Sequence, residues 1–373
     1  MDSEYFSPIL DVFQTDLVKM IYDCLLEGTY STKRIKIELY KLNVYGMHSI
    51  FICLHLTLCC YIDKGSFFKP HVDTTPRSKN MFGSLVIVFP TPHEGGALHL
   101  HHRGQEWIFD SGRELAAKDK PSIGYVAFFS DIEHEVSPVT SGHRVTLTYN
   151  LYFDDDGPVS ANDAGSMHLA PPLVNEGAFR EAFAALLENP EFLAEGGTLA
   201  FGLRHVYPIQ DSTDLKHVYN ILKGSDAVVY WSVRANGFEP VLYMYYENDR
   251  FDPAEGVLVD EVVNFTGFCD PENRDVIDFL HEEGGAIVTR DREYFREEYM
   301  RESLYETAEE VEWVTPMTTI NQKEDAYISY GNEAALNCVY GEICLVVRIG
   351  KAGDRLAYPT TAELNKRRGY YVE

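Results

Sequence analysis

The chain is poor in positive charge. Its 373 residues include 32 lysines and arginines against 58 aspartates and glutamates, which gives a formal net charge of −26. A surface of this sign repels phosphate backbones and acidic lipid headgroups wherever salt does not screen it. Neither nucleic acid nor a membrane surface is therefore an expected partner.

Patterned cysteines and a signal peptide are also lacking. The seven cysteines are odd in number and show no C-x-x-C spacing, which argues against a disulfide framework and against a zinc ribbon. The N-terminal stretch "MDSEYFSPILDVFQ" has no basic start followed by an apolar run. We expect a cytoplasmic or nuclear location.

Only one long segment is almost free of charge. It is "MHSIFICLHLTLCCYI", residues 47–62, which contains two histidines and is shorter than the roughly 20 apolar residues that span a bilayer. A membrane span is not expected there. Because 45% of all residues are hydrophobic, the chain can bury a sizeable core and more than one domain.

Hydrophobic periodicity changes along the chain. Apolar positions recur at helical spacing from Ile9 to Leu25, so residues 1–34 are predicted to be a helical segment. Residues 35–153 instead hold short runs rich in Val, Ile, Tyr, Phe and Thr, such as "IKIELYKLNVY", "FGSLVIVFP" and "HRVTLTYNLYF". Turn residues separate these runs and leave no room for crossover helices. This pattern predicts an antiparallel jelly-roll.

A second domain is predicted to follow a linker. Residues 154–172 are rich in Asp, Gly, Pro, Ser and Asn, which is typical of a linker. Residues 173–373 mix helical spacing with apolar runs such as "VLYMYY" and "ICLVVRI", which indicates an α+β domain of unknown role or a second sheet docked on the first. The acidic stretch 296–312 predicts a solvated helix. The fold class is thus mainly β with flanking helices.

The stretch "FFKPHVDTTPRS" places His71 and Asp73 two residues apart. In an extended strand such residues share a face, so both side chains can reach one cavity. His134, in "FFSDIEHEVSPV", is the inward residue if that stretch is extended. Two imidazoles and one carboxylate that leave three positions open suit non-haem Fe(II). A hydrogen-bonded polar pair at a strand end is the plainer interpretation of His71 and Asp73 alone.

Arg144 opens the strand "SGHRVTLTYNLY", ten residues after His134. Arg144, Thr146 and Thr148 alternate with apolar residues and therefore share one face. A guanidinium fork and two hydroxyls on that face suit the distal carboxylate of a dicarboxylic acid.

Together, the stretches "FFKPHVDT", "EGGALHLH" and "FFSDIEHEVSPV…HRVTLTYNLYF" resemble the Fe(II)- and 2-oxoglutarate-dependent dioxygenases. They are most similar to the prolyl 4-hydroxylase branch, and the whole chain resembles fungal members with a C-terminal extension. The resemblance implies a double-stranded β-helix catalytic domain over residues 35–153, Fe(II) held by His71, Asp73 and His134, and 2-oxoglutarate held by Arg144.

The reaction that this resemblance implies consumes O₂ as cosubstrate and converts 2-oxoglutarate to succinate and CO₂. The implied substrate is a prolyl or other amino-acid side chain, in a peptide, a protein or a free amino acid, and ascorbate is a candidate reductant. The protein would supply geometry and exclude water. A catalytically degenerate jelly-roll that acts as a binding module is the alternative.

Two departures from the family pattern stand out, a missing tyrosine and an additional apolar segment. Many prolyl hydroxylases have a 2-oxoglutarate-binding tyrosine on the strand after H-x-D, whereas this chain has "SLVIVF", so Thr146, Thr148 or Tyr45 would assist Arg144. Asp73 argues against the halogenating relatives, which have Gly or Ala there. Residues 47–64 separate two strands that a short turn joins in relatives. A gene-model error and a genuine lid or partner-binding insert both stay open, as does a folding-defective product.

Other polar residues have simpler explanations. His99 and His101 alternate with leucines and so predict the histidine face of a half-buried strand, with a substrate contact by His101 left open. Tyr40 is expected to pack in the barrel. The histidines of the second half, His205, His217 and His281, lack a matching H-x-D or arginine and are expected to be structural.

Overall fold

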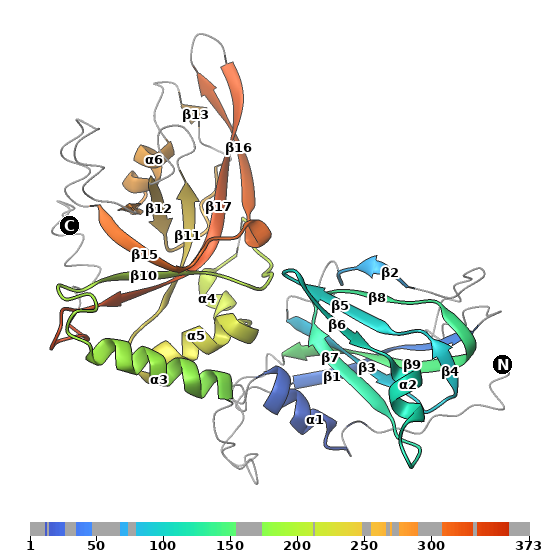
Figure 1. Cartoon of the computed structure of the whole chain (residues 1–373). Coiled ribbons are helices and arrows are strands. Elements are labelled where there is room, and N and C mark those ends of the chain that lie inside the picture. The colour runs from blue at the N-terminus through green and yellow to red at the C-terminus, as the bar shows by residue number, and fades with distance from the viewer. Residues whose placement is uncertain are drawn as a thin grey trace. The chain divides into compact units, whose positions relative to one another are not determined.

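The computed structural model divides the chain into two compact units, Met1–Pro171 and Pro172–Glu373 (Figure 1). It describes residues 12, 15–26, 35–46, 68–73, 80–153, 174–211, 213–247, 255–265, 269–270, 276–289, 308–330 and 334–357. The anomalous segment 47–64, the loop residues 74–79 and the linker 154–172 lie outside these ranges, so the hypotheses about them stay predictions.

The first unit opens with a short helix. α1 (Leu17–Met20) continues into a π-helical turn, η3 (Ile21–Leu25), which contacts strand β7 (Gly124–Phe129). Leu17, Ile21 and Leu26 are buried, as the apolar spacing of this segment predicts. Among the described residues, no helix is long and apolar enough to cross a bilayer.

The larger sheet of the first unit supplies one wall of the site. Its order is β1 (Ile35–Gly46), β9 (Val139–Phe153), β3 (Met81–Val88) and β7 (Gly124–Phe129), and β4 (His93–Gly95) pairs with the start of β9. All these pairings are antiparallel. A bulge between Leu39 and Lys41 shifts the register of β1 against β9.

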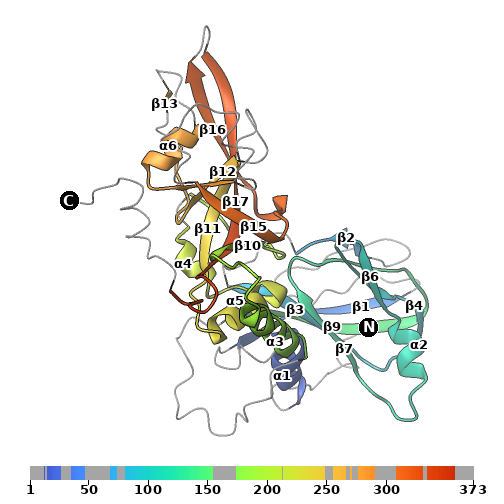
Figure 2. The ribbon, with the colours of Figure 1, turned by 60° about the vertical axis from the view of Figure 1, so that its left-hand side comes forward.

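The smaller sheet lies opposite the larger one (Figures 1 and 2). Its order is β2 (Phe68–His71), β8 (Glu133–Val136), β5 (Leu98–His102) and β6 (Gln105–Phe109). A buried apolar cluster joins the sheets, with Leu98, Ile132 and Val136 from the smaller sheet and its loop and Phe128 from β7. Two facing antiparallel sheets around this core confirm the predicted jelly-roll class.

Two short elements of this unit were missed in the sequence. The helix α2 (Ser111–Ala116) follows β6, and its N-cap Asp110 accepts a hydrogen bond from the Arg113 backbone N–H at 3.1 Å. The other is β4, whose three residues are too few to show a periodicity.

The second unit has an eight-stranded sheet of its own. The order is β10 (Gly197–Gly202), β15 (Glu309–Thr315), β14 (Ala286–Thr289), β12 (Glu255–Val259), β11 (Val241–Glu247), β17 (Ala334–Ile349), β16 (Lys323–Tyr330) and β13 (Cys269–Asp270). Because β10 also pairs with β17, the first six of these strands close into a ring. Its helices are α3 (Val174–Glu188), α4 (Leu215–Val218), α5 (Gly224–Ala235), α6 (Val276–Glu282) and the 3₁₀ turn η4 (Thr319–Asn321).

The prediction of a helix for the acidic stretch 296–312 is wrong for the residues of this stretch that the structure describes. Residues 309–312 belong to strand β15 rather than to a helix. Glu309 is buried there because its two carboxylate oxygens accept hydrogen bonds from Arg348, at 2.8 Å from Nε and 3.0 Å from Nη2. Arg348 thus neutralises the Glu309 carboxylate, which was predicted from the sequence to face solvent.

A buried carboxylate organises the second unit next to β10. Asp226, in the first turn of α5, accepts hydrogen bonds from the backbone N–H of Arg204 at 2.9 Å, from that of His205 at 3.0 Å and from the Tyr207 hydroxyl at 2.9 Å. Burial raises the pKa of Asp226, and these donors oppose the shift. The side chain thus joins the segment after β10 to the start of α5.

We expect Asp226→Ala to destabilise the second unit by roughly 3 kcal/mol, because three buried donors lose their acceptor. Urea unfolding monitored by tryptophan fluorescence measures this in a Trp107→Phe background, since Trp231 and Trp313, the other two tryptophans, lie in the second unit. The matched control is Asp214→Ala, which removes only the N-cap of α4 and should cost about 1 kcal/mol. Equal losses in the two variants would contradict the organising role of Asp226.

Candidate functional site

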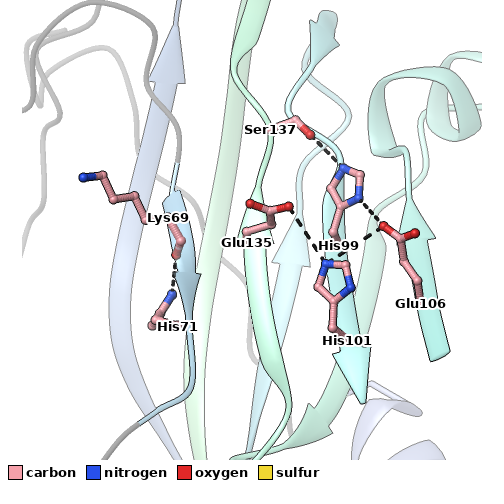
Figure 3. A network of polar contacts seen from close by, with 7 residues as sticks. All are labelled: Lys69, His71, His99, His101, Glu106, Glu135 and Ser137. Atoms are coloured by element: carbon pink, nitrogen blue, oxygen red, sulfur yellow. Dashed lines mark hydrogen bonds and ion pairs between the residues drawn. The ribbon is translucent and has the colours of Figure 1, made fainter. Parts of the chain in front are cut away.

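Strand pairing brings two histidines together. His71 at the end of β2 lies directly opposite His134 on β8, and their ring centroids are 4.2 Å apart. His71 Nδ1 lies 2.8 Å from the Lys69 carbonyl oxygen, and His134 Nδ1 lies 3.0 Å from that of Ile132 (Figure 3 shows the His71 contact). A carbonyl only accepts, so each Nδ1 carries the proton and each Nε2 keeps its lone pair. Metal-binding histidines are oriented in this way.

Asp73 completes a group of three. The Ser84 hydroxyl on β3 donates to Asp73 Oδ2 at 2.8 Å. One potential ligand atom each from His71, Asp73 and His134 lies within 4.8 Å of the others. Burial lowers the pKa of His134, which favours the neutral imidazole that a metal requires. Within the described ranges, no other His, Cys, Asp and Glu side chains form such a group.

The three side chains open onto a cavity of about 370 Å³ that is lined by both sheets. Among the apolar side chains that line it, Phe68 lies against the ring of His71 and Phe128 against that of His134. The remaining predicted site residues also line it: Tyr45, Arg144, Thr146 and Thr148. The structure therefore brings all seven predicted site residues to one cavity.

Arg144 is a buried charged residue of the cavity wall whose hydrogen-bond donors are only partly satisfied. Its side chain is only 1% exposed, yet Nε and Nη2 have no hydrogen-bond partner among the described residues. The guanidinium lies 5.3 Å from the ring centroid of Tyr45, which is opposite Arg144 on β1. Burial lowers the pKa of Arg144, and Tyr45 opposes this shift. A buried charge with unsatisfied donors is costly, so the site suits a bound anion.

Two further buried polar atoms beside Arg144 lack partners among the described residues. They are Thr146 Oγ1 and Asn43 Oδ1, on residues that face each other across β9 and β1. Unpartnered polar groups are rare in protein interiors and require an explanation. A carboxylate, which accepts hydrogen bonds at two oxygens, fits the guanidinium fork and the hydroxyl.

Gly96 makes room for the Arg144 side chain because it has no Cβ. Its backbone has a φ of +70°, and a Cβ there would lie 2.8 Å from Arg144 Cδ and 2.8 Å from Val139 Cγ2. Only glycine meets both conditions without strain. The glycine pair in "EGGALHLH" is thus tied to the position of Arg144.

His99 and His101 do not line the cavity, whereas Leu98 on the same strand does. Figure 3 shows the polar contacts of the two histidines. His99 Nε2 is 2.7 Å from Ser137 Oγ, and its Nδ1 is 3.1 Å from Glu106 Oε1. His101 Nε2 lies 3.9 Å from carboxylate oxygens of Glu106 and Glu135. These contacts give both histidines a structural role, in line with the predicted histidine face.

Two residues of the site, Asn43 and Ser84, were not predicted from the sequence. Ser84 supports Asp73 from a neighbouring strand. Asn43 shares a strand face with Tyr45, so the two-residue period of β1 was an available signal. Their contacts nevertheless depend on the pairing of distant strands.

Residues 56–152 match the family model described as "2OG-Fe(II) oxygenase superfamily". The chain thus carries a 2OG-Fe(II) oxygenase superfamily domain, and the matched residues include His71, Asp73, His134 and Arg144. No curated protein matches the chain.

Two solved structures show weak similarity to the chain. A Pseudomonas putida prolyl-4-hydroxylase is 17% identical with a TM-score of 0.23, and the match covers 37% of this chain and 61% of that one. An oxidoreductase of the 2OG-Fe(II) oxygenase family from Burkholderia pseudomallei is 20% identical with a TM-score of 0.19, and the match covers 24% and 38%. The chain therefore spans less than two thirds of either protein.

We expect Ser84→Ala to weaken divalent-metal binding about tenfold, because the Asp73 carboxylate loses the hydroxyl that orients it. Calorimetric titration of the full chain with Mn(II) measures the affinity. Ser111→Ala is the matched control, since Ser111 is also buried but bonds to His93 at 3.0 Å outside the cavity wall. A Ser84→Ala affinity equal to that of Ser111→Ala would contradict the role of Ser84.

Proposed function

We propose that the first unit is an Fe(II)- and 2-oxoglutarate-dependent dioxygenase that hydroxylates a prolyl or other amino-acid side chain. One observation carries the proposal: a potential metal triad lines the same cavity as a buried arginine with two nitrogens that lack partners among the described residues. A metal and an anion are thus accommodated side by side. The match of residues 56–152 supports the reaction class.

In this proposal, His71 and His134 hold Fe(II) through Nε2 and Asp73 holds it through a carboxylate oxygen. The donor set fits the ion, because two neutral imidazoles and one carboxylate on one side leave positions open. The carbonyl oxygens of Lys69 and Ile132 orient the rings, and Ser84 orients the carboxylate. These contacts preorganise the ligands.

Arg144 binds the distal carboxylate of 2-oxoglutarate, and Thr146, Thr148 and Tyr45 assist it. Buried charge and unsatisfied donors explain why this end of the cavity requires an acid. The bound iron and 2-oxoglutarate supply the oxidative decarboxylation to succinate and CO₂ and the oxygenation of a C–H bond with O₂. The aromatic side chains of Phe68 and Phe128 exclude water beside the histidines.

The finer parts of the proposal rest on the resemblance in sequence. They are the prolyl 4-hydroxylase-like branch with its fungal members, the peptide, protein or amino-acid substrate, ascorbate as reductant, and the cytoplasmic or nuclear location. The domain limits 1–34, 35–153, 154–172 and 173–373 likewise stay predictions. No observation on the described residues favours the binding-module alternative, because a scaffold has no need for a buried arginine with unsatisfied donors.

We expect His71→Ala and Arg144→Ala each to abolish Fe(II)-dependent conversion of 2-oxoglutarate to succinate, because one removes a metal ligand and the other the anion's partner. Succinate is quantified by NMR with the full chain, with and without Fe(II). The control His99→Ala removes an imidazole from the outer face of β5 and should retain most of the turnover. Turnover that is equal in wild type, His71→Ala and Arg144→Ala would refute the proposal.

A further inference from the structure

We propose that Asn43 is a fourth hydrogen-bond donor to the carboxylate that Arg144 binds, and that it makes the site selective for 2-oxo acids with a distal carboxylate. The inference rests on the proposed function and adds a residue to it. Asn43 would contact the cosubstrate directly, through its side-chain amide.

The surroundings of Asn43 are those of a ligand-binding residue. It is 5% exposed, it lines the cavity, and it lies opposite Thr146 in the register of β1 and β9. Its Nδ2 donates to Thr148 Oγ1 at 3.3 Å, while Oδ1 has no partner among the described residues. Because only one of the two polar atoms of this buried amide forms a hydrogen bond, we infer that the other end of the amide is available to a ligand.

The amide can present either of its ends to the cavity. Rotation by a half-turn about the Cβ–Cγ bond exchanges Oδ1 and Nδ2, and the Thr148 hydroxyl, which donates as well as accepts, then donates to Oδ1. Thr148 thus assists the carboxylate by orienting Asn43. Nδ2 becomes available to a ligand in this orientation. A carboxylate only accepts, so its binding selects the rotated amide.

One carboxylate would then satisfy the unpartnered atoms that the described residues of this wall present. Arg144 Nε and Nη2 form a fork, and the Thr146 hydroxyl and the Asn43 amide add two more donors. An ionised carboxylate offers about four lone-pair sites, which matches this number of donors. The arrangement therefore recognises the distal carboxylate of the cosubstrate rather than its 2-oxo acid end.

The isosteric change Asn43→Asp tests this role. An aspartate here only accepts and is negatively charged, so it repels the incoming carboxylate and pairs with Arg144 in its place. We expect 2-oxoglutarate to bind roughly 100-fold more weakly, and about tenfold more weakly to Asn43→Leu, which removes the donor without adding charge. Binding to the Mn(II)-loaded full chain is measured by calorimetry, and thermal melting checks that each variant is folded.

The control ligand is 2-oxobutyrate, which has the 2-oxo acid group but no distal carboxylate. Its affinity should change less than about twofold in both variants. Unchanged 2-oxoglutarate binding in Asn43→Asp and Asn43→Leu, or equal losses for both ligands, would overturn the role of Asn43 and leave the proposed function standing. Wild type that binds Mn(II) but not 2-oxoglutarate would instead overturn the proposed function.

Discussion

The antiparallel pairing of β2 with β8 is the constraint on which the site depends. It places His71 opposite His134, and a slip of one residue would turn an imidazole away from the cavity. The outer face helps to hold β8 in place, because Glu135 lies beside His101 on β5. Because each ring is fixed by the backbone carbonyl two residues before it, only Asp73 needs support from the opposite sheet, and Ser84 provides it.

The burial of Arg144 is the second constraint on the site. The Arg144 guanidinium lies near the Tyr45 ring, and its side chain passes Gly96 at a distance that leaves no room for a Cβ. Two of its nitrogens lack partners among the described residues. Such a group lowers stability unless an anion binds, so its burial fits the anion site that we propose. On the same cavity wall, Asn43 Oδ1 and Thr146 Oγ1 are also buried without a hydrogen-bond partner among the described residues.

The parts of the site that follow from local periodicity could be predicted from the sequence. The shared face of Arg144, Thr146 and Thr148 follows from the two-residue period of β9. The same period predicted that His71 and Asp73 reach one cavity, although β2 ends at His71 and Asp73 lies just beyond it. The two-residue period of β1 places Asn43 on the face of Tyr45, but its contact with Thr148, 105 residues away, depends on the pairing of β1 with β9 and could not be predicted. Glu309 was misassigned for a similar reason, since the arginine that neutralises it lies 39 residues further on. Local patterns thus predicted strands and faces, while pairings between distant strands came only from the structure.

The crystal structure of the full chain with Mn(II) and 2-oxoglutarate, with the metal located by anomalous scattering, tests the central claim most directly. The account predicts one Mn(II) bound by His71 Nε2, Asp73 and His134 Nε2, with the distal carboxylate of 2-oxoglutarate on the Arg144 guanidinium. Mn(II) at other side chains, or a guanidinium that contacts no carboxylate while the metal is bound, would contradict it.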